Sequence, residues 1–433
     1  MLAVCRRPLS LHYRNRARIP LDQRFIPHAL SNPTDSASTR ARSAVRALRA
    51  SRIREVADVG MGREDVLVFW FGEPDEVTPE FIRQAGKAAL DAGDTFYTQN
   101  LGIASLRAAL ATYISGLRAS VRDDEIAVTN SGMSALMLAT QALVGPGDRV
   151  VIVTPLWPNL VEIPKILGAQ VQTVALQFGP KGWYLDLDRL LATLTPQTRA
   201  LYLNTPNNPT GWTLSTAERD AIVAHCRRHG IWMLSDDAYE RLCFDTSAAA
   251  TPSLMDVRDP QDRMVSTNTF SKSWLMTGWR LGWIVAPRPL IEDLGTLIEY
   301  NTSCAPGFVQ RAGVVAVTQG EPVIARTRVR FQAARDHLLT GLASIEGVLA
   351  ASPPAAMYAF FRVQGMNDSL AFCKRAVQSY GLGLAPGVAF GPEGEGYLRW
   401  CFAATPERLS AGLDRFARAL GDHHSQREPA CPI

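Results

Sequence analysis

Short apolar runs that alternate with helical stretches most constrain the fold of this chain, and the alternation begins at Glu125. The strand-like runs are 126–128, 150–153, 171–175, 200–203, 232–234, 264–269 and 282–286. Helical patterns such as 133–144 and 216–229 lie between several of them. Strands that alternate with helices over this length predict a mostly parallel sheet covered by helices on both faces. We therefore expect an α/β fold whose ligands bind beyond the carboxyl ends of the strands.

A different pattern follows the last of these strands. The elements expected there are helices at 323–342, 369–380 and 406–420 and strands at 358–363 and 397–402. This order predicts a second, smaller α+β domain. The expected division is a head at 1–42, an N-terminal segment at 43–73 that packs with the small domain, a large domain at 74–295, the small domain at 296–421 and a tail at 422–433.

The region ahead of the alternation is also expected to be partly helical. The apolar spacing within 43–59 predicts a short amphipathic helix. Residues 66–71 form a strand-like run. Thr78-Pro79-Glu80 predicts the capped start of a helix over 78–90, because proline is favoured at the first helical position. A further helix is expected at 103–117.

Composition excludes several classes of protein. The 433 residues are 47% hydrophobic and 20% charged, as in globular proteins with room for two domains. We expect no membrane association, because no apolar run approaches the roughly 18 residues that a span requires. The seven cysteines form no CxxC pair and have no metal-like spacing with histidine. We therefore expect no metal site, and the reduced thiols of a cytoplasmic protein.

The net charge of +4 hides a basic head. Residues 1–54 hold twelve arginines, no lysine and two aspartates, so they carry +10, and the remainder carries −6. Because the body is mildly acidic, we expect no nucleic-acid partner. Four prolines interrupt the head, which predicts a poorly ordered or appended segment. An arginine-rich, acid-poor composition also fits a transit peptide, and an over-extended reading frame is a third alternative.

The stretch Thr267–Trp283 contains the first candidates for chemistry. Lys272 lies between Ser271 and Ser273, and Arg280 follows eight residues after the lysine. Hydroxyls, backbone N–H groups and the planar guanidinium suit a bound phosphate. A lysine amine can form a Schiff base with a carbonyl cofactor. Taken alone, Lys272 fits a solvated surface lysine better, so the interpretation depends on the rest of the chain.

Two clusters follow neighbouring strand-like runs. Asn204–Gly211, with the sequence NTPNNPTG, predicts a tight turn, and on its own it is most simply a plain turn. Asp236-Asp-Ala-Tyr239 ends the next run. A carboxylate there can keep a pyridinium nitrogen protonated, and the tyrosine hydroxyl can reach a ring oxygen. The alternative is that Asp236 caps a helix.

Three further clusters are weaker signals. Asn130-Ser131-Gly132 joins a strand to the start of a helix, where free N–H groups bind phosphate. Trp157 could stack on a flat ring, although a tryptophan is more often part of a core. Arg399 interrupts an apolar strand, and a buried arginine needs an anionic partner. That partner is either a ligand or an internal carboxylate.

These motifs, in this order, resemble one family: the class I/II aminotransferases, which are pyridoxal-phosphate enzymes of fold type I. The motifs are GEPD at 72–75, YTQNLG at 97–102, SG at 131–132, PLW at 155–157, NNPTG at 207–211, DDAY at 236–239, SK and TGWRLG within 271–282 and LRW at 398–400. The resemblance covers roughly residues 43–420. It implies pyridoxal 5′-phosphate as the cofactor, an amino acid and a 2-oxo acid as substrates, and a homodimer with shared active sites.

The resemblance also implies a role for each residue. Lys272 would form the Schiff base and move the proton, Asp236 would pair with the pyridine nitrogen, and Tyr239 would contact the ring oxygen. Asn208 would contact the same oxygen and, with Arg399 and the backbone of Gly72, the substrate α-carboxylate. The other implied cofactor contacts are Ser131, Gly132, Met133, Trp157, Thr269, Ser271, Arg280 and Tyr97 of the partner subunit.

The function that the sequence predicts is transfer of an amino group between an L-amino acid and a 2-oxo acid. A mild preference for an apolar or aromatic substrate is expected from Trp70, Phe71, Met133 and Trp157. A lyase or synthase on the same scaffold, such as a carbon–sulfur lyase, would use the same residues. A second alternative is a non-catalytic regulator that senses pyridoxal phosphate, but the proline-broken head does not fit a helix-turn-helix module.

Overall fold

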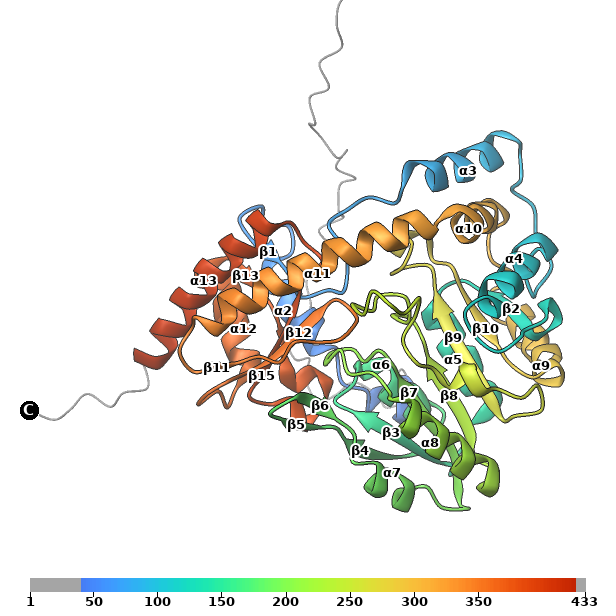
Figure 1. Ribbon diagram of the computed structural model, residues 1–433, viewed down its shortest axis with the longest axis horizontal. Coiled ribbons are helices and arrows are strands. Elements are labelled where there is room, and N and C mark those ends of the chain that lie inside the picture. The colour runs from blue at the N-terminus through green and yellow to red at the C-terminus, as the bar shows by residue number, and fades with distance from the viewer. Residues whose placement is uncertain (1–39, 426–433) are drawn as a thin grey trace, which may run out of the picture. The chain divides into compact units, whose positions relative to one another are not determined.

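A seven-stranded sheet forms the centre of the larger part of the chain in the computed structural model, which describes residues 40–425 (Figure 1). In spatial order the strands are β2 (Ile126–Thr129), β10 (Gly282–Val285), β9 (Met264–Thr269), β8 (Trp232–Asp236), β7 (Thr198–Asn204), β3 (Arg149–Thr154) and β4 (Gln170–Ala175). Neighbours are parallel except at β10, which is antiparallel to both β2 and β9. The predicted α/β fold with a mostly parallel sheet is confirmed.

Helices cover both faces of this sheet because its strands are apolar on both faces. In β3, Val150 and Ile152 pack with one set of helices, whereas Val151 and Val153 pack with the other. The first set is α5 (Gly132–Leu143), α6 (Pro158–Ile166) and α9 (Arg288–Glu299). The second set is α3 (Glu80–Asp91), α4 (Ala104–Ser115), α7 (Leu187–Thr193), α8 (Thr216–His229) and α10 (Gly307–Gln319). This sandwich leaves the carboxyl ends of the strands as the place for a ligand.

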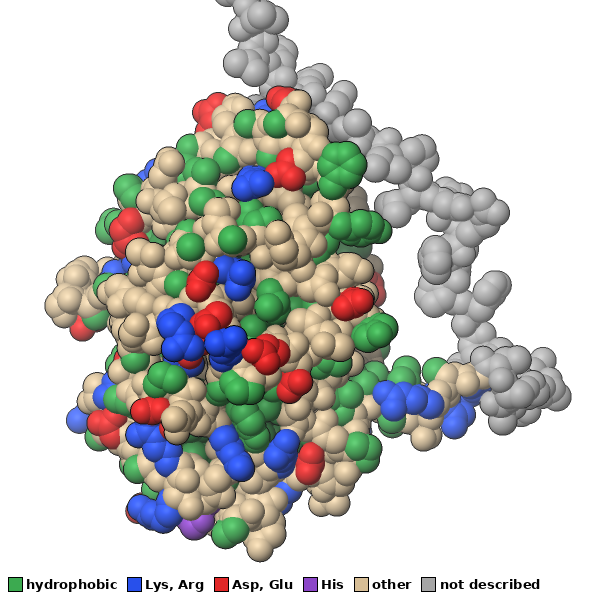
Figure 2. All heavy atoms as spheres, turned by 90° about the vertical axis from the view of Figure 1, so that its right-hand side faces the viewer, with side chains coloured by type: hydrophobic (Ala, Val, Ile, Leu, Met, Phe, Trp, Pro, Cys, Tyr) green, Lys and Arg blue, Asp and Glu red, His purple; other side chains and the backbone are tan. Residues whose placement is uncertain are grey.

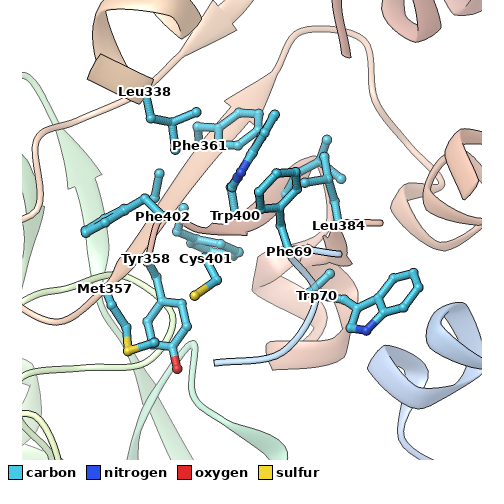
Figure 3. Packing of buried hydrophobic residues seen from close by; sticks show 14 of the residues in the cluster. Phe69, Trp70, Leu338, Met357, Tyr358, Phe361, Leu384, Trp400, Cys401 and Phe402 are labelled. Carbon is cyan, nitrogen blue, oxygen red and sulfur yellow. The ribbon is translucent and has the colours of Figure 1, made fainter. Parts of the chain in front are cut away.

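A second, antiparallel sheet has its own core. Its order is β11 (Val348–Leu349), β12 (Tyr358–Val363), β15 (Tyr397–Cys401) and β14 (Ala385–Pro386). The helices around it are α2 (Arg52–Gly60), α11 (Glu321–Ala343), α12 (Ser369–Tyr380) and α13 (Pro406–Ser425). Phe69, Phe361 and Trp400 pack together in this core (Figure 3).

The N-terminal segment is part of this second core. β1 (Leu67–Val68) pairs in parallel with β13 (Leu382–Gly383), and Ile53 and Val56 of α2 are buried among the same residues. Residues from the two ends of the described chain therefore build one core. The remaining elements are α1 (Ser43–Arg46), the hairpin β5 (Gln177–Gly179) and β6 (Gly182–Tyr184), and the 3₁₀ helices η2 (Asp123–Glu125), η3 (Leu254–Val257), η4 (Thr277–Trp279), η5 (Gly387–Phe390) and η6 (Pro392–Gly394).

Three local expectations were wrong. The single helix expected at 43–59 is two helices, because the chain leaves the helical conformation at 47–51 before Ser51 caps α2. The strand expected at 66–71 is only β1. Thr78 does not cap α3, since its hydroxyl donates to the Leu275 carbonyl at 2.6 Å, and Pro79 occupies the N-cap position.

Some expectations concern the ends of the chain and its surface. Most of the predicted head lies outside the described residues, and the predicted tail is helical as far as Ser425, beyond which nothing is described. No helix within residues 40–425 is long and apolar enough to cross a membrane. On the face shown in Figure 2, acidic and basic side chains are interspersed with apolar ones.

Candidate active site

A cavity of about 410 Å³ lies at the carboxyl ends of the strands in the large sheet. One part of its lining follows those strands, and we call it the sheet side: Gly132, Met133, Trp157, Asn208, Asp236, Tyr239, Thr269, Ser271, Lys272 and Arg280. The other part comes from the N-terminal segment and the second sheet, and we call it the closing side: Ser51, Ile53, Arg54, Phe71, Gly72, Tyr358 and Arg399. Twelve of the fourteen residues predicted for the site therefore line one cavity.

The sheet side is assembled by strand ends. Asp236 is the last residue of β8, and Asn204 opposite it is the last residue of β7. Lys272 follows the end of β9 at Thr269. Because parallel strands end at one edge of the sheet, side chains that are distant in sequence reach the same cavity.

Lys272 lies at the boundary of the two sides. Its Nζ donates to the Gly72 carbonyl oxygen at 2.5 Å and lies 5.8 Å from the centre of the Tyr239 ring. Burial lowers the pKa of the Lys272 amine to about 8, because a charged amine is poorly solvated there. About a tenth of the amine is therefore neutral, and nucleophilic, near pH 7, far more than for a solvated lysine.

Asp236 and Asp237 have different surroundings although they are adjacent. Asp236 lines the cavity, and its carboxylate accepts hydrogen bonds from Asn204 Nδ2 at 3.2 Å and the Ala238 N–H at 3.3 Å. Asp237 points away and accepts from the hydroxyls of Ser235 and Ser266, at 2.7 and 2.5 Å. Burial, and then the charge of Asp237, raise the pKa of Asp236 to about 7. A cation placed beside Asp236 would favour its ionised form.

A second tyrosine stands beside Tyr239. The Tyr239 and Tyr358 hydroxyls are 2.7 Å apart, and both side chains are buried. In Figure 3 the Tyr358 ring projects from its strand with its hydroxyl directed away from the aromatic core. Gly72 makes room for that hydroxyl, since a Cβ at Gly72 would lie 1.8 Å from it. Burial holds the pKa of Tyr239 well above its usual value, so its hydroxyl keeps its proton.

Arg399 is a buried cation held from several directions. Its guanidinium lies between the Tyr358 and Phe390 rings, 4.5 and 4.8 Å from their centres. Nη1 donates to Asn208 Oδ1 at 2.9 Å, and Nη2 donates to the Trp70 carbonyl. Nε has no hydrogen-bond partner among the residues at 40–425. A buried guanidinium with one unsatisfied donor, in a residue that lines a cavity, suits an anionic ligand.

The start of α5 and the segment after β9 form an anion-binding corner. Ser131 caps α5 by accepting from the Ser134 N–H at 3.1 Å, and Thr269 and Ser271 place their hydroxyls 2.9 Å apart. A Cβ at Gly132 would approach the Cβ of Thr269 to 3.0 Å, so a larger residue at 132 would force Thr269 to shift. Arg280 is exposed to the same cavity. Donors of this kind at a helix start suit a phosphate.

Two predicted residues lie elsewhere. Ser131 precedes the lining residue Gly132 without lining the cavity itself. Tyr97 is 90% exposed and lies outside the cavity, on a surface that it shares with Phe96 and Cys304. Within a single chain, Tyr97 therefore does not meet the other residues of the site.

Several residues of the site were missed by sequence reasoning. Tyr358 and Arg54 lie in ordinary apolar or polar contexts and form no motif, and Asn204 is noted only as the first residue of a turn. Asn204 opens the NTPNNPTG turn, so its place at a strand end was the one available signal. The guanidinium of Arg54 lies 5.7 Å from the centre of the Phe71 ring at the cavity wall.

Comparisons with known proteins identify the family. The family profile described as aminotransferase class I and II matches residues 64–416. The chain belongs to this family. It is 32% identical to a probable N-acetyl-LL-diaminopimelate aminotransferase of Bacillus subtilis, over 86% of this chain and 93% of that protein. It is 31% identical to an aspartate aminotransferase of Pyrococcus horikoshii, over 86% and 95% of the two chains.

A solved structure agrees with the family assignment. A mutant of the Thermus thermophilus aspartate aminotransferase superposes with a TM-score of 0.80 at 30% identity, covering 88% of this chain and 99% of the other. The protein is therefore an aminotransferase-family enzyme of fold type I, and the cofactor of this family is pyridoxal 5′-phosphate. The cavity fits that group. Lys272, a buried carboxylate, an anion-binding corner and a buried arginine line it together.

Proposed function

We propose that the protein transfers an amino group between an L-amino acid and a 2-oxo acid in two successive half-reactions. The observation that carries this proposal is that Lys272, Asp236, Arg280 and Arg399 line one cavity. In such a reaction Lys272 would react with a carbonyl and Asp236 would pair with a ring nitrogen. Arg280 would bind a phosphate and Arg399 a carboxylate. An amino acid and a 2-oxo acid are the small-molecule partners that this arrangement suits.

The residues of the sheet side would perform the chemistry. Bound pyridoxal phosphate supplies an aldehyde that reacts with amines and a cationic ring that withdraws electrons. Lys272 Nζ would hold the cofactor until the substrate amine replaces it, and would then move the proton released from the substrate α-carbon. The lowered pKa of Lys272 favours this role, because a neutral amine is required. The Asp236 carboxylate would keep the ring nitrogen protonated.

The remaining cavity residues would bind and orient. Tyr239 and Asn208 would donate to the ring oxygen, and Trp157 and Met133 would pack against the ring. The phosphate would be held by Arg280, the hydroxyls of Thr269 and Ser271, and the N–H groups that follow Ser131. Arg399, with Asn208 and the backbone of Gly72, would bind the substrate α-carboxylate and so fix the direction of the breaking C–H bond.

We also propose a homodimer in which Tyr97 of the partner subunit completes each site. Phe96, Tyr97 and Tyr300 are 82%, 90% and 85% exposed, which is unusual for aromatic side chains and favours a contact surface. A cytoplasmic location is proposed from the cysteines, since the five within the described residues are all free.

The side chain of the substrate is the least constrained part of the proposal. The names of the relatives differ in substrate, one being a diaminopimelate derivative and the other aspartate. Here the wall combines apolar groups, Ile53, Phe71 and Met133, with the guanidinium of Arg54. Such a wall suits an apolar stem, and Arg54 would stabilise a negatively charged end.

A half-reaction screen tests the proposed function. The enzyme loaded with pyridoxal phosphate is mixed with single amino acids, and conversion to the pyridoxamine form is followed by absorbance. A 2-oxo acid should then restore the starting spectrum. Release of a 2-oxo acid or a sulfur product without any acceptor would indicate a lyase. A protein that is converted by no amino acid would refute the proposal.

A further inference from the structure

We propose that Asn204 is a positioning residue that couples the cofactor end of the active site to its substrate end. The inference rests on the proposed function, and it gives a role to Asn204, which the sequence marks only as the first residue of a turn. Asn204 neither lines the cavity nor faces solvent, being 2% exposed. Its side chain is placed between two of the residues that do line it.

The geometry is a continuous hydrogen-bonded chain. Asn204 Nδ2 donates to Asp236 Oδ2 at 3.2 Å and to the Asp236 carbonyl at 3.1 Å. The other end of the same amide, Oδ1, accepts from the Asn208 N–H at 2.7 Å. Asn208 Oδ1 in turn accepts from Arg399 Nη1 at 2.9 Å. Four buried residues thus link the carboxylate at the ring nitrogen to the arginine at the substrate carboxylate.

An asparagine is well suited to this position. A primary amide offers a donor on one side and an acceptor on the other, and here both are used inside the protein. Aspartate at 204 would keep the acceptor for Asn208 but would lose the donor to Asp236. Alanine would remove both and leave a buried carboxylate oxygen and a buried N–H without partners, which is costly. Comparing the two replacements therefore distinguishes loss of the hydrogen bond to Asp236 from loss of the hydrogen bond to Asn208.

The predicted consequence differs at the two ends. At the cofactor end, Asp236 without its Asn204 donor would hold a cationic ring nitrogen less firmly. At the substrate end, the turn that carries Asn208 would lose its anchor, and Arg399 would lose a fixed partner. If Asn204 only supported the turn, replacing it would lower the stability of the turn but would change neither the protonation of the ring nitrogen nor the binding of a carboxylate.

The turn contains a matched control. Asn207 is equally buried, at 1% exposed, and its side-chain oxygen accepts from the N–H and hydroxyl of Thr210, at 3.1 and 2.8 Å. It thus supports the same turn without joining the chain between Asp236 and Arg399. Asn207→Ala reports what loss of turn support does alone.

The experiment compares wild type, Asn204→Ala, Asn204→Asp and Asn207→Ala as holoenzymes. The first measurement is the pH midpoint of the visible absorption of the cofactor bound to Lys272. The second is calorimetric binding of 3-phenylpropanoate and of glutarate, which are carboxylates without an amino group. In Asn204→Ala, the midpoint should rise, because a ring that keeps its proton less firmly repels the neighbouring Schiff-base proton less. Carboxylate affinity should fall roughly tenfold.

The other variants decide between coupling and simple support. Asn204→Asp should change the midpoint while its carboxylate affinity stays near that of wild type, and Asn207→Ala should leave both values unchanged. The proposal is overturned if Asn204→Ala matches wild type in both measurements, if Asn207→Ala reproduces its effects, or if Asn204→Asp loses carboxylate affinity to the same extent. Asn204→Asp is nearly isosteric and decides the question if the alanine variant does not fold. A wild-type protein that forms no visible band, or binds neither carboxylate, would refute the proposed function instead.

Discussion

The two sides of the cavity are built in different ways. On the sheet side, Asp236 and Lys272 stand at or just after the ends of adjacent strands, so their positions follow from the order of elements along the chain. On the closing side, Arg399 belongs to strand β15 of the second sheet, and Gly72 belongs to the N-terminal segment that follows β1. The sheet side concentrates the groups that suit the cofactor, and the closing side those that suit the substrate. Substitutions on the two sides should therefore have different kinetic signatures.

The largest effect is expected at Lys272. Lys272→Ala removes the amine that would attach the cofactor and move the proton, so the rate should fall by roughly 10⁴-fold or more. The visible absorption of the attached cofactor should disappear. Lys272→Arg is the matched control, because it keeps a charge but forms no Schiff base. An unchanged absorption band in the alanine variant would show that another group attaches the cofactor.

The next effect tests the sheet side more finely. Asp236→Ala should lower the rate roughly 10³-fold while weakening cofactor retention much less, since the phosphate contacts remain. Asp237→Ala should lower the rate less, because Asp237 is bonded to Ser235 and Ser266 and faces away from the cavity. Steady-state kinetics and equilibrium dialysis of the cofactor measure the two effects. Equal losses in the two variants would mean that Asp236 is not the carboxylate that serves the ring nitrogen.

On the closing side, Arg399→Ala should impair every amino acid tested. Loss of a desolvated, charged partner costs roughly 2–5 kcal/mol in binding. Primary amines that lack a carboxylate should lose little, and cofactor affinity should stay near wild type. Half-reaction rates with matched amino acids and amines measure this difference. A loss confined to one class of side chain would make Arg399 a specificity residue, and would weaken the contrast between the two sides.

Tyr97 lines neither the sheet side nor the closing side of the cavity in its own chain. A hydrogen bond to a charged phosphate contributes roughly 1.5–3 kcal/mol, so Tyr97→Ala should loosen the cofactor and slow turnover. Mixing Tyr97→Ala subunits with Lys272→Ala subunits should restore activity, since one site of each mixed dimer then carries no lesion. Differential tags identify the mixed dimers. If activity stays absent in confirmed mixed dimers, Tyr97 does not act across an interface.

The smallest effect concerns the pH dependence of cofactor capture. Burial lowers the pKa of Lys272 to about 8, and only the neutral amine reacts with an aldehyde. The rate at which the apoenzyme captures pyridoxal phosphate should rise about tenfold between pH 7 and 9 and then level off. Stopped-flow absorbance follows this step. A rate that still rises steeply above pH 9 would indicate an ordinary, solvated lysine.

The sequence predicts the sheet side more fully than the closing side. Strand patterns and the turn residues that follow them predict Asp236, Asn208 and Lys272 at one edge of a parallel sheet, and all three line the cavity there. Strand β10 lies between β2 and β9 and is antiparallel to both. The sequence could not predict this, because the spacing of hydrophobic residues does not show the direction of a strand.

The residues that sequence reasoning missed share one property. Tyr358 belongs to the site because its hydroxyl meets Tyr239, and Asn204 because its amide lies between Asp236 and Asn208. Each is defined by a neighbour in space, and no local pattern reports such a neighbour. Thr78 shows the opposite error, where a good local signal for a helix cap was overridden by a tertiary hydrogen bond to Leu275.

The contact between Arg399 and Trp70 also bears on when the cavity can form during synthesis. Arg399 bonds to the Trp70 carbonyl across 329 positions of sequence, and closing so long a loop has a large entropic cost. A nascent chain that has exposed Lys272 and Asp236 still lacks Arg399 until the second sheet has left the ribosome. The large sheet can therefore assemble first, whereas the closing side of the cavity must wait for nearly the whole chain. Truncated translation products would carry the lysine and the carboxylate but not the arginine.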